Sequence, residues 1–496
     1  MSRRRLPENE VERSLDPDDW TSLRALGHRA VDEMFDYLES VRERPAWRPL
    51  PESSRALFSE PVPEKATPVG EVYEQVARHV LPYPTNNIHP RFWSWVGGTG
   101  TPVQVIADLV ASAMNATSLG FDEAASTYVE LQLLDWLKSL LDVPQDASGL
   151  LVSGGSMANL VGLAVARNEK APHDVRADGV GDSVRLRYYA STEAHSSVRK
   201  AVELLGLGNG ALRLVPVRDD FTIDVGALAD AIEADRRQGR VPACIVANAG
   251  TVNTGALDPL HALADLAQAE GLWLHVDGAF GAFAKLSPEY RGLVDGLERA
   301  DSLAFDLHKW LYVQYDCGCV LVRSASAHNR TFSVTPSYLR KFERGLASGP
   351  INFSEYGVQL SRSFKALRAW MALKTEGAGR YGQQIAQNIR QARYLDSLVA
   401  SEPRLERLAP TAMNIVNFRY VAPGLDAGAL DDLNAEILMR LHERGIAAPS
   451  STVLNGRFSL RVANCNHRSR REDFRALVEG VLAIGDELVT GNLRAG

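Results

Sequence analysis

A lysine between a histidine and a tryptophan is the feature of the sequence that most clearly indicates covalent chemistry. Lys309 stands between His308 and Trp310, just after the short apolar run 302–305. A lysine held in a partly desolvated site has a lowered pKa, and its amine forms Schiff bases with carbonyl compounds. A solvated surface lysine fits this apolar neighbourhood poorly. The segment therefore predicts an amine that bonds covalently to an aldehyde or ketone.

A single carboxylate ends a second apolar run. Asp277 follows residues 272–276, and a buried carboxylate is costly unless it has a partner. A cationic ligand nitrogen, an arginine or a metal would each serve as that partner. His275 lies on the same pleat face as Asp277. No third residue stands at a spacing typical of a catalytic triad or a metal pair, and we predict no metal site.

A run of small residues opens a helix after residues 149–153. Gly154, Gly155 and Ser156 let the backbone approach a ligand closely, and the free N–H groups of a helix start attract phosphate. Taken alone, a tight turn with Ser156 as the helix cap explains the run equally well. The run matches neither the glycine-rich nucleotide motifs nor the G-x-S-x-G of serine hydrolases.

A histidine begins another helix, where it can cap, stack or carry a proton. His195 follows the apolar run 186–190, and such a histidine alone is more often structural. The hydroxyl-rich turn 250–255 is, by itself, a loop. Together the segments offer an anion cradle, a gap beside His195, a buried carboxylate and a reactive lysine. Pyridoxal 5′-phosphate has a phosphate, a pyridine nitrogen and an aldehyde, and it fits this set.

Alternating helices and short apolar strands must position these residues. From residue 101 to 377 this alternation predicts a large α/β domain with a mainly parallel sheet, in which ligands bind beyond the carboxyl ends of the strands. Residues 378–496 predict a small α+β domain. Residues 1–100 predict a helical, proline-rich dimerisation arm that needs a partner surface. The seven candidate strands are 149–153, 186–190, 212–216, 243–248, 272–276, 302–305 and 318–323.

Composition excludes several classes of protein. The 496 residues have a net charge of −7, which disfavours a nucleic-acid binder. No apolar run is long enough to span a bilayer, and the first residues lack the apolar segment of a secretory signal. The 4 cysteines include no C-x-x-C pair, so we expect buried packing thiols at Cys317 and Cys319. We expect a cytoplasmic protein that binds neither membrane nor nucleic acid.

These motifs, in this order, resemble the group II pyridoxal-phosphate-dependent amino acid decarboxylases of the aromatic-L-amino-acid type, which have fold type I. The resemblance runs from about residue 20 to 488, and H-V-D-G-A followed by H-K-W about 30 residues later is its most specific part. The matching stretches are His89-Pro-Arg-Phe-Trp, Ser153-Gly-Gly-Ser-Met-Ala-Asn, Ala194-His-Ser-Ser-Val, Leu274-His-Val-Asp-Gly-Ala, Ala300-Asp-Ser, Asp306-Leu-His-Lys-Trp, Ser361-Arg-Ser-Phe-Lys and Leu460-Arg-Val-Ala-Asn.

The resemblance implies a role for each cofactor-site residue. Lys309 would hold the cofactor as a Schiff base, and Asp277 would pair with its protonated ring nitrogen. Asp306 stands where relatives more often have asparagine, and a charged carboxylate there would repel a phosphate. The remaining implied contacts are His195 and Ala279 on the two ring faces, Gly155, Ser156 and His308 at the phosphate, and Thr251 or Val252 beside the ring.

The substrate side is implied by aromatic residues and by one loop. The segments that contain Phe92, Trp93, Trp95 and Phe121 line the substrate pocket in relatives, although packing in the core explains these side chains equally well. Phe353 stands where aromatic-type relatives carry a mobile-loop tyrosine that protonates the carbanionic intermediate. Because the loop is about one residue longer here, Asn352 is a rival for that position, and Tyr356 lies nearby.

The resemblance implies a homodimeric enzyme that decarboxylates an aromatic L-amino acid, with its active site near the subunit interface. In plant relatives a phenylalanine at the loop position accompanies oxidative decarboxylation and deamination to an aldehyde, which is the first alternative. A transaminase or carbon–sulfur lyase is the second, because a fold does not fix a reaction. A binding protein without catalytic activity is the third.

Overall fold

The computed structural model describes residues 14–181, 185–334 and 341–495, which fall into two compact units. The first unit comprises residues 14–44 and 49–84 and is helical. Asp19 caps its first helix by accepting hydrogen bonds from the Thr21 and Ser22 N–H groups. The unit contains α1 (Trp20–Glu39), η1 (Ser40–Glu43), α2 (Glu52–Leu57) and α3 (Val69–His79).

A seven-stranded sheet dominates the second unit, as the alternating sequence pattern predicts. Its strand order is β2-β8-β7-β6-β5-β3-β4, and only β8 runs antiparallel to its neighbours. The predicted α/β fold class is therefore confirmed. The strands are β2 (Ser148–Val152), β3 (Leu186–Ser191), β4 (Leu212–Val215), β5 (Val241–Asn248), β6 (Trp273–Asp277), β7 (Ser302–Asp306) and β8 (Gly318–Val322).

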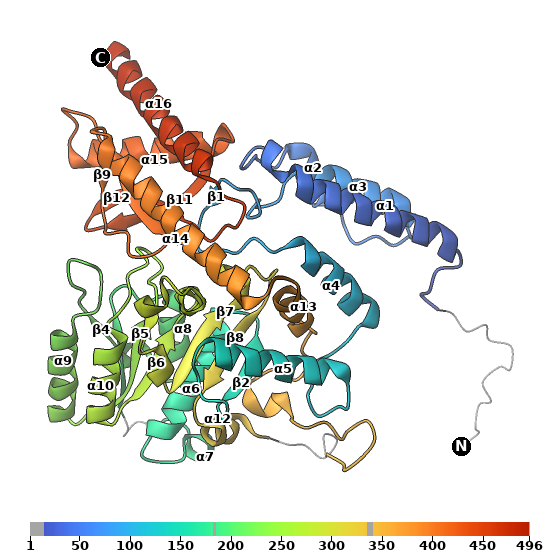
Figure 1. Cartoon of the computed structure of the whole chain (residues 1–496), viewed down its shortest axis with the longest axis vertical. Coiled ribbons are helices and arrows are strands. Elements are labelled where there is room, and N and C mark those ends of the chain that lie inside the picture. The colour runs from blue at the N-terminus through green and yellow to red at the C-terminus, as the bar shows by residue number, and fades with distance from the viewer. Residues whose placement is uncertain (1–13, 182–184, 335–340, 496) are drawn as a thin grey trace. The chain divides into compact units, whose positions relative to one another are not determined.

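Helices connect and cover these strands (Figure 1). The helix α6 packs against five of them, β2, β5, β6, β7 and β8. The helices are α4 (Pro102–Met114), α5 (Ala125–Leu140), α6 (Gly155–Lys170), α7 (Val175–Asp178), α8 (Ser196–Leu204), α9 (Val225–Arg237), α10 (Leu260–Glu270), α11 (Leu307–Trp310), α12 (Ala325–Phe332) and α13 (Ala366–Glu376). Short 3-10 helices lie at Asn209–Ala211, Gly281–Leu286, Arg291–Val294, Leu297–Arg299 and Phe353–Tyr356.

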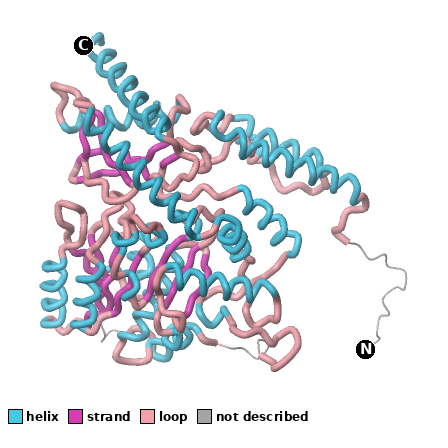
Figure 2. Tube along the Cα trace, in the orientation of Figure 1, coloured by secondary structure: helices cyan, strands magenta, loops and turns pink. Residues whose placement is uncertain are grey.

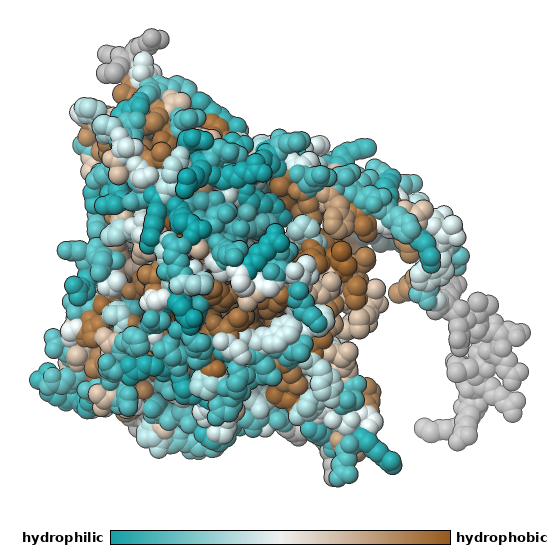
Figure 3. Space-filling view, in the orientation of Figure 1, coloured by the Kyte–Doolittle hydropathy of each residue, from teal (hydrophilic) through white to brown (hydrophobic). Residues whose placement is uncertain are grey.

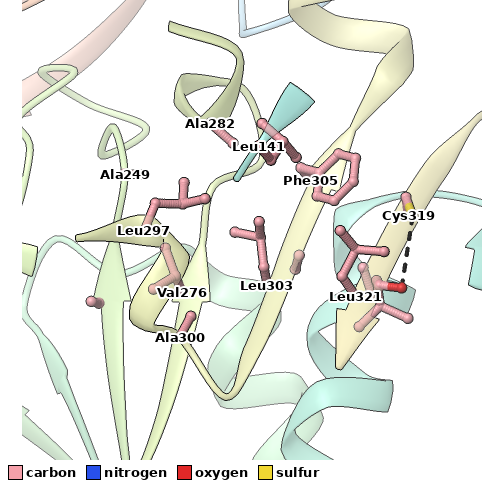
Figure 4. Close-up of a cluster of buried hydrophobic side chains, with 14 of the residues drawn as sticks. Leu141, Ala249, Val276, Ala282, Leu297, Ala300, Leu303, Phe305, Cys319 and Leu321 are labelled. Atoms are coloured by element: carbon pink, nitrogen blue, oxygen red, sulfur yellow. Dashed lines mark hydrogen bonds between the residues drawn. The ribbon is translucent and has the colours of Figure 1, made fainter. Parts of the chain in front are cut away.

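The central strands are apolar along their whole length because both sheet faces are covered. Every residue of β6, β7 and β8 is buried. Figure 4 shows Val276, Leu303, Phe305 and Leu321 packing together in this core. Cys319 lies among them as a free, buried thiol whose pKa burial raises well above the usual value. Cys317 is also free and buried, so the expectation of packing thiols is confirmed.

A second sheet of five strands lies apart from the first, as the strands in Figure 2 show. Its order is β1-β11-β12-β10-β9, and β1 is the one parallel neighbour. The two residues of β1 come from far earlier in the chain than the rest of this sheet. The elements are β1 (Phe92–Trp93), α14 (Ala378–Ser401), β9 (Leu405–Arg407), β10 (Ile415–Tyr420), α15 (Ala427–Glu443), β11 (Ala448–Leu454), β12 (Arg457–Ala463) and α16 (Arg471–Ala495). None of the helices described here is long and apolar enough to cross a membrane.

Candidate active site

A cavity of about 890 Å³ lies beyond the carboxyl ends of the strands of the large sheet. Residues of β11 and β12 in the small sheet also line it. This is the place where an open α/β sheet binds its ligand. Residues from the ends of β2, β3, β5, β6 and β7 meet here. Of the residues singled out in the sequence, those on the wall are Trp95, Gly154, Gly155, Ser156, His195, Val252, Asp277, Ala279, Asp306, His308 and Lys309.

The lysine at the cavity is paired with a carboxylate. Lys309 Nζ lies 2.8 Å from Asp306 Oδ2, and the two residues are three apart across the start of α11. Burial lowers the pKa of the Lys309 amine, but the nearby carboxylates of Asp306 and Asp277 outweigh it, so the pKa is raised. The prediction of a lowered pKa for Lys309 is therefore wrong for the chain without a ligand. It considered burial but not the negative charge of Asp306.

The carboxylate of Asp277 is held at the end of β6 by two donors. The Asn159 side-chain amide donates to Asp277 Oδ2 at 2.8 Å, and the Ala279 N–H donates to Oδ1 at 3.1 Å. The residue is 5% exposed, and its side chain lines the cavity. Each oxygen keeps a free lone pair, so Asp277 can still accept a hydrogen bond from a ligand N–H group.

The start of α6 leaves space and N–H groups for an anion. Gly154 precedes the helix, and no side chain caps it. A methyl group built on Gly155 would lie 2.9 Å from Asp306 Oδ2, and one on Gly318 would lie 2.5 Å from the Gly154 Cα. Only glycine permits such close approach. The free helix N-terminus offers the donors and the positive dipole that a phosphate requires.

Two further side chains complete the wall at this end. His308 Nδ1 accepts a hydrogen bond from the Cys317 N–H at 3.1 Å, so a neutral ring carries its proton on Nε2. Burial lowers the pKa of His308. Its ring centre lies 4.4 Å from that of Tyr315. Tyr315 lies outside any strand or helix, six residues beyond Lys309, and no motif in the sequence marks it.

An arginine on β12 also lines the cavity. Arg461 is 4% exposed and donates to the Val252 and Asn253 carbonyl oxygens and to Ser450 Oγ. Burial lowers its pKa to about 10. Within the described part of the chain it has no carboxylate partner. The Leu460-Arg461 motif was visible in the sequence, but nothing there connected it to a site more than 200 residues earlier.

Several predicted residues lie away from the cavity. The ring of Trp93 stacks on Phe474 in the core of the small sheet, 4.7 Å between centres. Phe92 packs in a small cluster with Ala448, and Phe121 is not on the cavity wall. Of the four predicted substrate-side aromatic residues, only Trp95 reaches the cavity.

The predicted loop position is also outside the cavity. Phe353 is fully buried, and the Arg362 guanidinium lies 4.7 Å from its ring centre. Asn352 caps the short helix that follows, and Tyr356 packs edge-on against His328. The structure thus places neither Phe353 nor its two neighbours against Lys309.

The turn after β5 differs from the predicted contact by one residue. The hydroxyl of Thr251 is buried within the turn, 3.0 Å from the Thr254 hydroxyl, and accepts from the Ala256 N–H. Val252 lines the cavity in its place. Of the two residues that the turn left open, Val252 lines the cavity and Thr251 does not, so a contact of Val252 with the ring stays a prediction.

The residues at the cavity fit pyridoxal 5′-phosphate. The start of α6 suits the phosphate, Asp277 suits a ring N–H, and Lys309 suits the aldehyde. Asp306 Oδ1 is buried without a partner among the described residues, but the charge of that carboxylate is offset by Lys309. In residues 14–181, 185–334 and 341–495, no three metal-binding side chains lie close enough together to hold a metal ion.

Comparison with known proteins gives a consistent result over nearly the whole chain. The family described as "Pyridoxal-dependent decarboxylase conserved domain" matches residues 51–421. The aromatic-L-amino-acid decarboxylase of Bacillus atrophaeus is 34% identical over 469 residues, which are 94% of this chain and 96% of the relative. The phenylacetaldehyde synthase of Arabidopsis thaliana is 27% identical, over 92% of this chain and 94% of that protein. The structure of Oryza sativa TDC with PLP and tryptamine superposes with a TM-score of 0.88 at 30% identity, covering 96% of this chain and 100% of that one.

Proposed function

The chain belongs to the pyridoxal-dependent decarboxylase family, and we propose that it converts an aromatic L-amino acid into the corresponding amine and CO₂. Its cofactor is pyridoxal 5′-phosphate. The observation that carries the proposal is the convergence of Lys309, Asp277 and the uncapped start of α6 on one cavity. When bound, the cofactor supplies an aldehyde for amines and a ring that takes up the electron pair left by departing CO₂.

Each polar residue then has a defined task. Lys309 provides the amine that holds the cofactor and gives way to the substrate amine. Asp277 keeps a proton on the ring nitrogen, because its carboxylate is buried and can accept one further hydrogen bond. His195 and Ala279, which both line the cavity, would contact the ring. Arg461 supplies a buried positive charge at the wall where a substrate carboxylate enters.

An aromatic substrate is supported by the apolar part of the wall. Trp95, Val252, Phe280 and Tyr315 line the cavity together with Val96. Flat aromatic and aliphatic surfaces of this kind bind an indole or phenyl ring through apolar burial and ring contacts. The Bacillus relative is named aromatic-L-amino-acid decarboxylase and a rice relative is named tryptophan decarboxylase 1, and both names agree with an aromatic substrate.

The amine product is supported by the one tyrosine on the described cavity wall. Release of an amine requires a proton donor at the carbon that loses CO₂, and Phe353 has no acidic proton to give. Tyr315 lies on the wall beside His308, and its hydroxyl sits close to Gly97 and Gly98. Tyr315 is 52% exposed, partial desolvation at the wall raises its pKa, and its hydroxyl is protonated at neutral pH. We assign proton donation to Tyr315.

The products and the role of Tyr315 are tested together. We expect the purified protein, given a panel of L-amino acids, to release CO₂ and amine in equal amounts from an aromatic member. Tyr315→Phe is expected to lower the amine rate by about 10²-fold, the usual contribution of a general acid. Tyr188→Phe is the control, because its buried hydroxyl donates to the Leu163 carbonyl and does not reach the cavity. An unchanged amine rate in Tyr315→Phe would refute the assignment to Tyr315.

The second candidate function is oxidative and is favoured by Phe353. In it the amino acid, O₂ and water yield an aldehyde, CO₂, ammonia and hydrogen peroxide. The Arabidopsis relative named phenylacetaldehyde synthase covers 92% of this chain. The same amino-acid panel decides between the two functions: peroxide and ammonia in equal amounts with CO₂ support the oxidative route, and amine alone excludes it.

We also propose a cytoplasmic homodimer with its active sites near the subunit interface, and with residues 1–100 contributing to that interface. The helix α4 leaves Ile106, Leu109, Val110 and Met114 exposed, and Figure 3 shows apolar side chains over this region. Such a contiguous apolar face is typical of a covered surface. We expect sedimentation to give twice the chain mass of 54.2 kDa and Leu109→Glu to shift the protein towards monomer. A wild-type protein that sediments as a monomer at micromolar concentration would refute the dimer.

A further inference from the structure

A continuous hydrogen-bond chain runs beneath the cavity from β6 to His195. We propose that Trp273, Ser302 and His275 are positioning residues, which act through this chain to hold the side-chain amide of Asn159 in place against Asp277 and Ser197. The inference rests on the proposed function for its catalytic meaning. The proton positions themselves follow from the geometry of the chain.

The first half of the chain lies between β6, β7 and α6. The Trp273 indole N–H donates to Ser302 Oγ at 2.8 Å. The same Oγ lies 2.7 Å from His275 Nδ1. On the other side of the ring, His275 Nε2 lies 2.9 Å from Asn159 Oδ1. Three elements are thereby connected through a single imidazole.

The second half divides at Asn159. Its Nδ2 donates to Asp277 Oδ2 at 2.8 Å and to Ser197 Oγ at 2.9 Å. Ser197 Oγ then lies 2.8 Å from His195 Nδ1, and the Ser197 N–H donates to the same nitrogen at 3.2 Å. One amide group therefore contacts the partner of the cofactor ring nitrogen and, through Ser197, the histidine beside the ring.

The direction of the hydrogen bonds is set from the Asp277 end. An ionised carboxylate can only accept, so Asp277 requires the NH₂ side of Asn159. The amide oxygen of Asn159 then faces His275 Nε2, which must carry the proton. His275 Nδ1 is therefore an acceptor, and the Ser302 hydroxyl, which accepts from the Trp273 indole N–H, gives it its own proton.

The chain is shielded from water, which would otherwise permit other arrangements. His275 is 0% exposed, and Ser302 and Asn159 are each 1% exposed. A methyl group on Gly162 would lie 2.6 Å from the ring of His275, so the glycine in α6 makes room for this ring. Burial lowers the pKa of His275 to about 3, which keeps the ring neutral.

The chain fixes His195 as a donor towards the cavity. Its Nδ1 accepts from both the Ser197 hydroxyl and the Ser197 N–H, and this nitrogen also caps α8. A neutral imidazole has one proton, which therefore lies on Nε2. His195 thus presents an N–H group to an anionic ligand group and cannot act as a base through Nδ1.

A pair of substitutions at His275 separates positioning from packing. His275→Gln keeps a donor for the Asn159 oxygen, whereas His275→Leu leaves that oxygen without a donor and holds the amide less firmly. The first readout is the ¹⁵N NMR spectrum of histidine-labelled full-length chain, as purified and after cofactor removal, with the His195 signal assigned from His195→Gln. We expect an Nε2–H tautomer at His195 in all three proteins, because the Ser197 N–H holds Nδ1 as an acceptor, and a His195 Nδ1 signal that is shifted in His275→Leu but not in His275→Gln. Tyr188→Phe is the control and should leave the signal unchanged.

The second readout is steady-state kinetics. We expect His275→Leu to lower kcat by about 10- to 100-fold, the usual effect of losing an orienting partner, and His275→Gln to restore most of it. A wild-type His195 protonated on Nδ1, or an unchanged His195 signal in His275→Leu, overturns the inference. If His275→Leu does not fold, Trp273→Phe is used in its place. The His275 NMR signal of Trp273→Phe is then compared with that of the wild type, and identical signals refute the inference. The NMR readout stands even if no amino acid is decarboxylated, so failure of the proposed function is distinguishable.

Discussion

Lys309→Ala is expected to lower kcat by at least about 10³-fold and to abolish covalent retention of the cofactor. The amine of Lys309 is the one lysine nitrogen on the described wall of the cavity, 2.8 Å from Asp306 Oδ2. Without it the cofactor has no amine to attach to and is held only by its phosphate and ring contacts. The visible absorption band of the wild type should be lost or shifted, and borohydride treatment should leave the cofactor removable by denaturation.

The matched control is a second lysine with little exposure. Lys138 donates to the Gln145 and Ala147 carbonyl oxygens, its side chain is 8% exposed, and it lies outside the cavity. Lys138→Ala should retain the absorption band and most of the activity. Cofactor that remains covalently bound to Lys309→Ala after borohydride treatment would show that another amine holds it.

The pairing of Lys309 with Asp306 shows what a local pattern can predict. The sequence correctly indicated an apolar neighbourhood, and from that alone a lowered lysine pKa followed. The structure shows that the decisive influence is one turn away, where opposite charges three residues apart pair across the start of α11. That spacing was visible in the sequence, but its effect depends on both side chains turning into the same cavity.

The large sheet was predictable because its strands are buried on both faces. The continuous apolar run 272–276 is shifted by one residue from β6, and the run 302–305 is one residue shorter than β7. The polar residues that follow such strands come together because parallel strands end at one sheet edge. This rule placed Asp277 and Asp306 near each other without any knowledge of long-range contacts.

The same rule could not show which aromatic residues near β1 line the cavity and which lie in the core. Alternation along a strand would put Trp93 and Trp95 on the same side. In the structure β1 ends at Trp93, and Trp95 has a φ of 57°. This left-handed conformation breaks the alternation, so Trp93 enters the core of the small sheet while Trp95 reaches the cavity. The backbone conformation at Trp95 therefore distinguishes the tryptophan that lines the cavity from the one in the core.

Residues that reach the cavity from distant parts of the chain were missed for a different reason. Arg461 contacts the turn at Val252 across 209 positions of sequence. Asn159 contacts Asp277 across 118 positions. Neither residue type is unusual where it stands in the sequence. Their importance comes from the packing of the small sheet and of α6 against the cavity, which periodicity and spacing do not encode.

Asp277→Asn is expected to lower kcat by about 10²- to 10³-fold, the usual effect of losing a preorganised electrostatic partner. The amide has almost the shape of the carboxylate but no charge, and it has one acceptor oxygen where the carboxylate has two. The Asn159 amide and the Ala279 N–H each donate to a different oxygen of Asp277. One of these donors would therefore face an NH₂ group, and the ring nitrogen would lose the anion that keeps it protonated.

The control for Asp277→Asn is another fully buried carboxylate of the same domain. Asp235 is 0% exposed, lies on α9 and pairs with Arg240 and Arg213 outside the cavity. Asp235→Asn should lower the thermal midpoint while the activity of the folded fraction is retained, because it breaks an ion pair and leaves the cavity intact. Asp277→Asn should show the opposite pattern: a nearly unchanged midpoint, a much reduced kcat and an altered pH dependence of cofactor absorption. If Asp277→Asn lost stability but kept its kcat, Asp277 would serve only to anchor Asn159 and Ala279. A different group on the wall would then have to keep the ring nitrogen protonated.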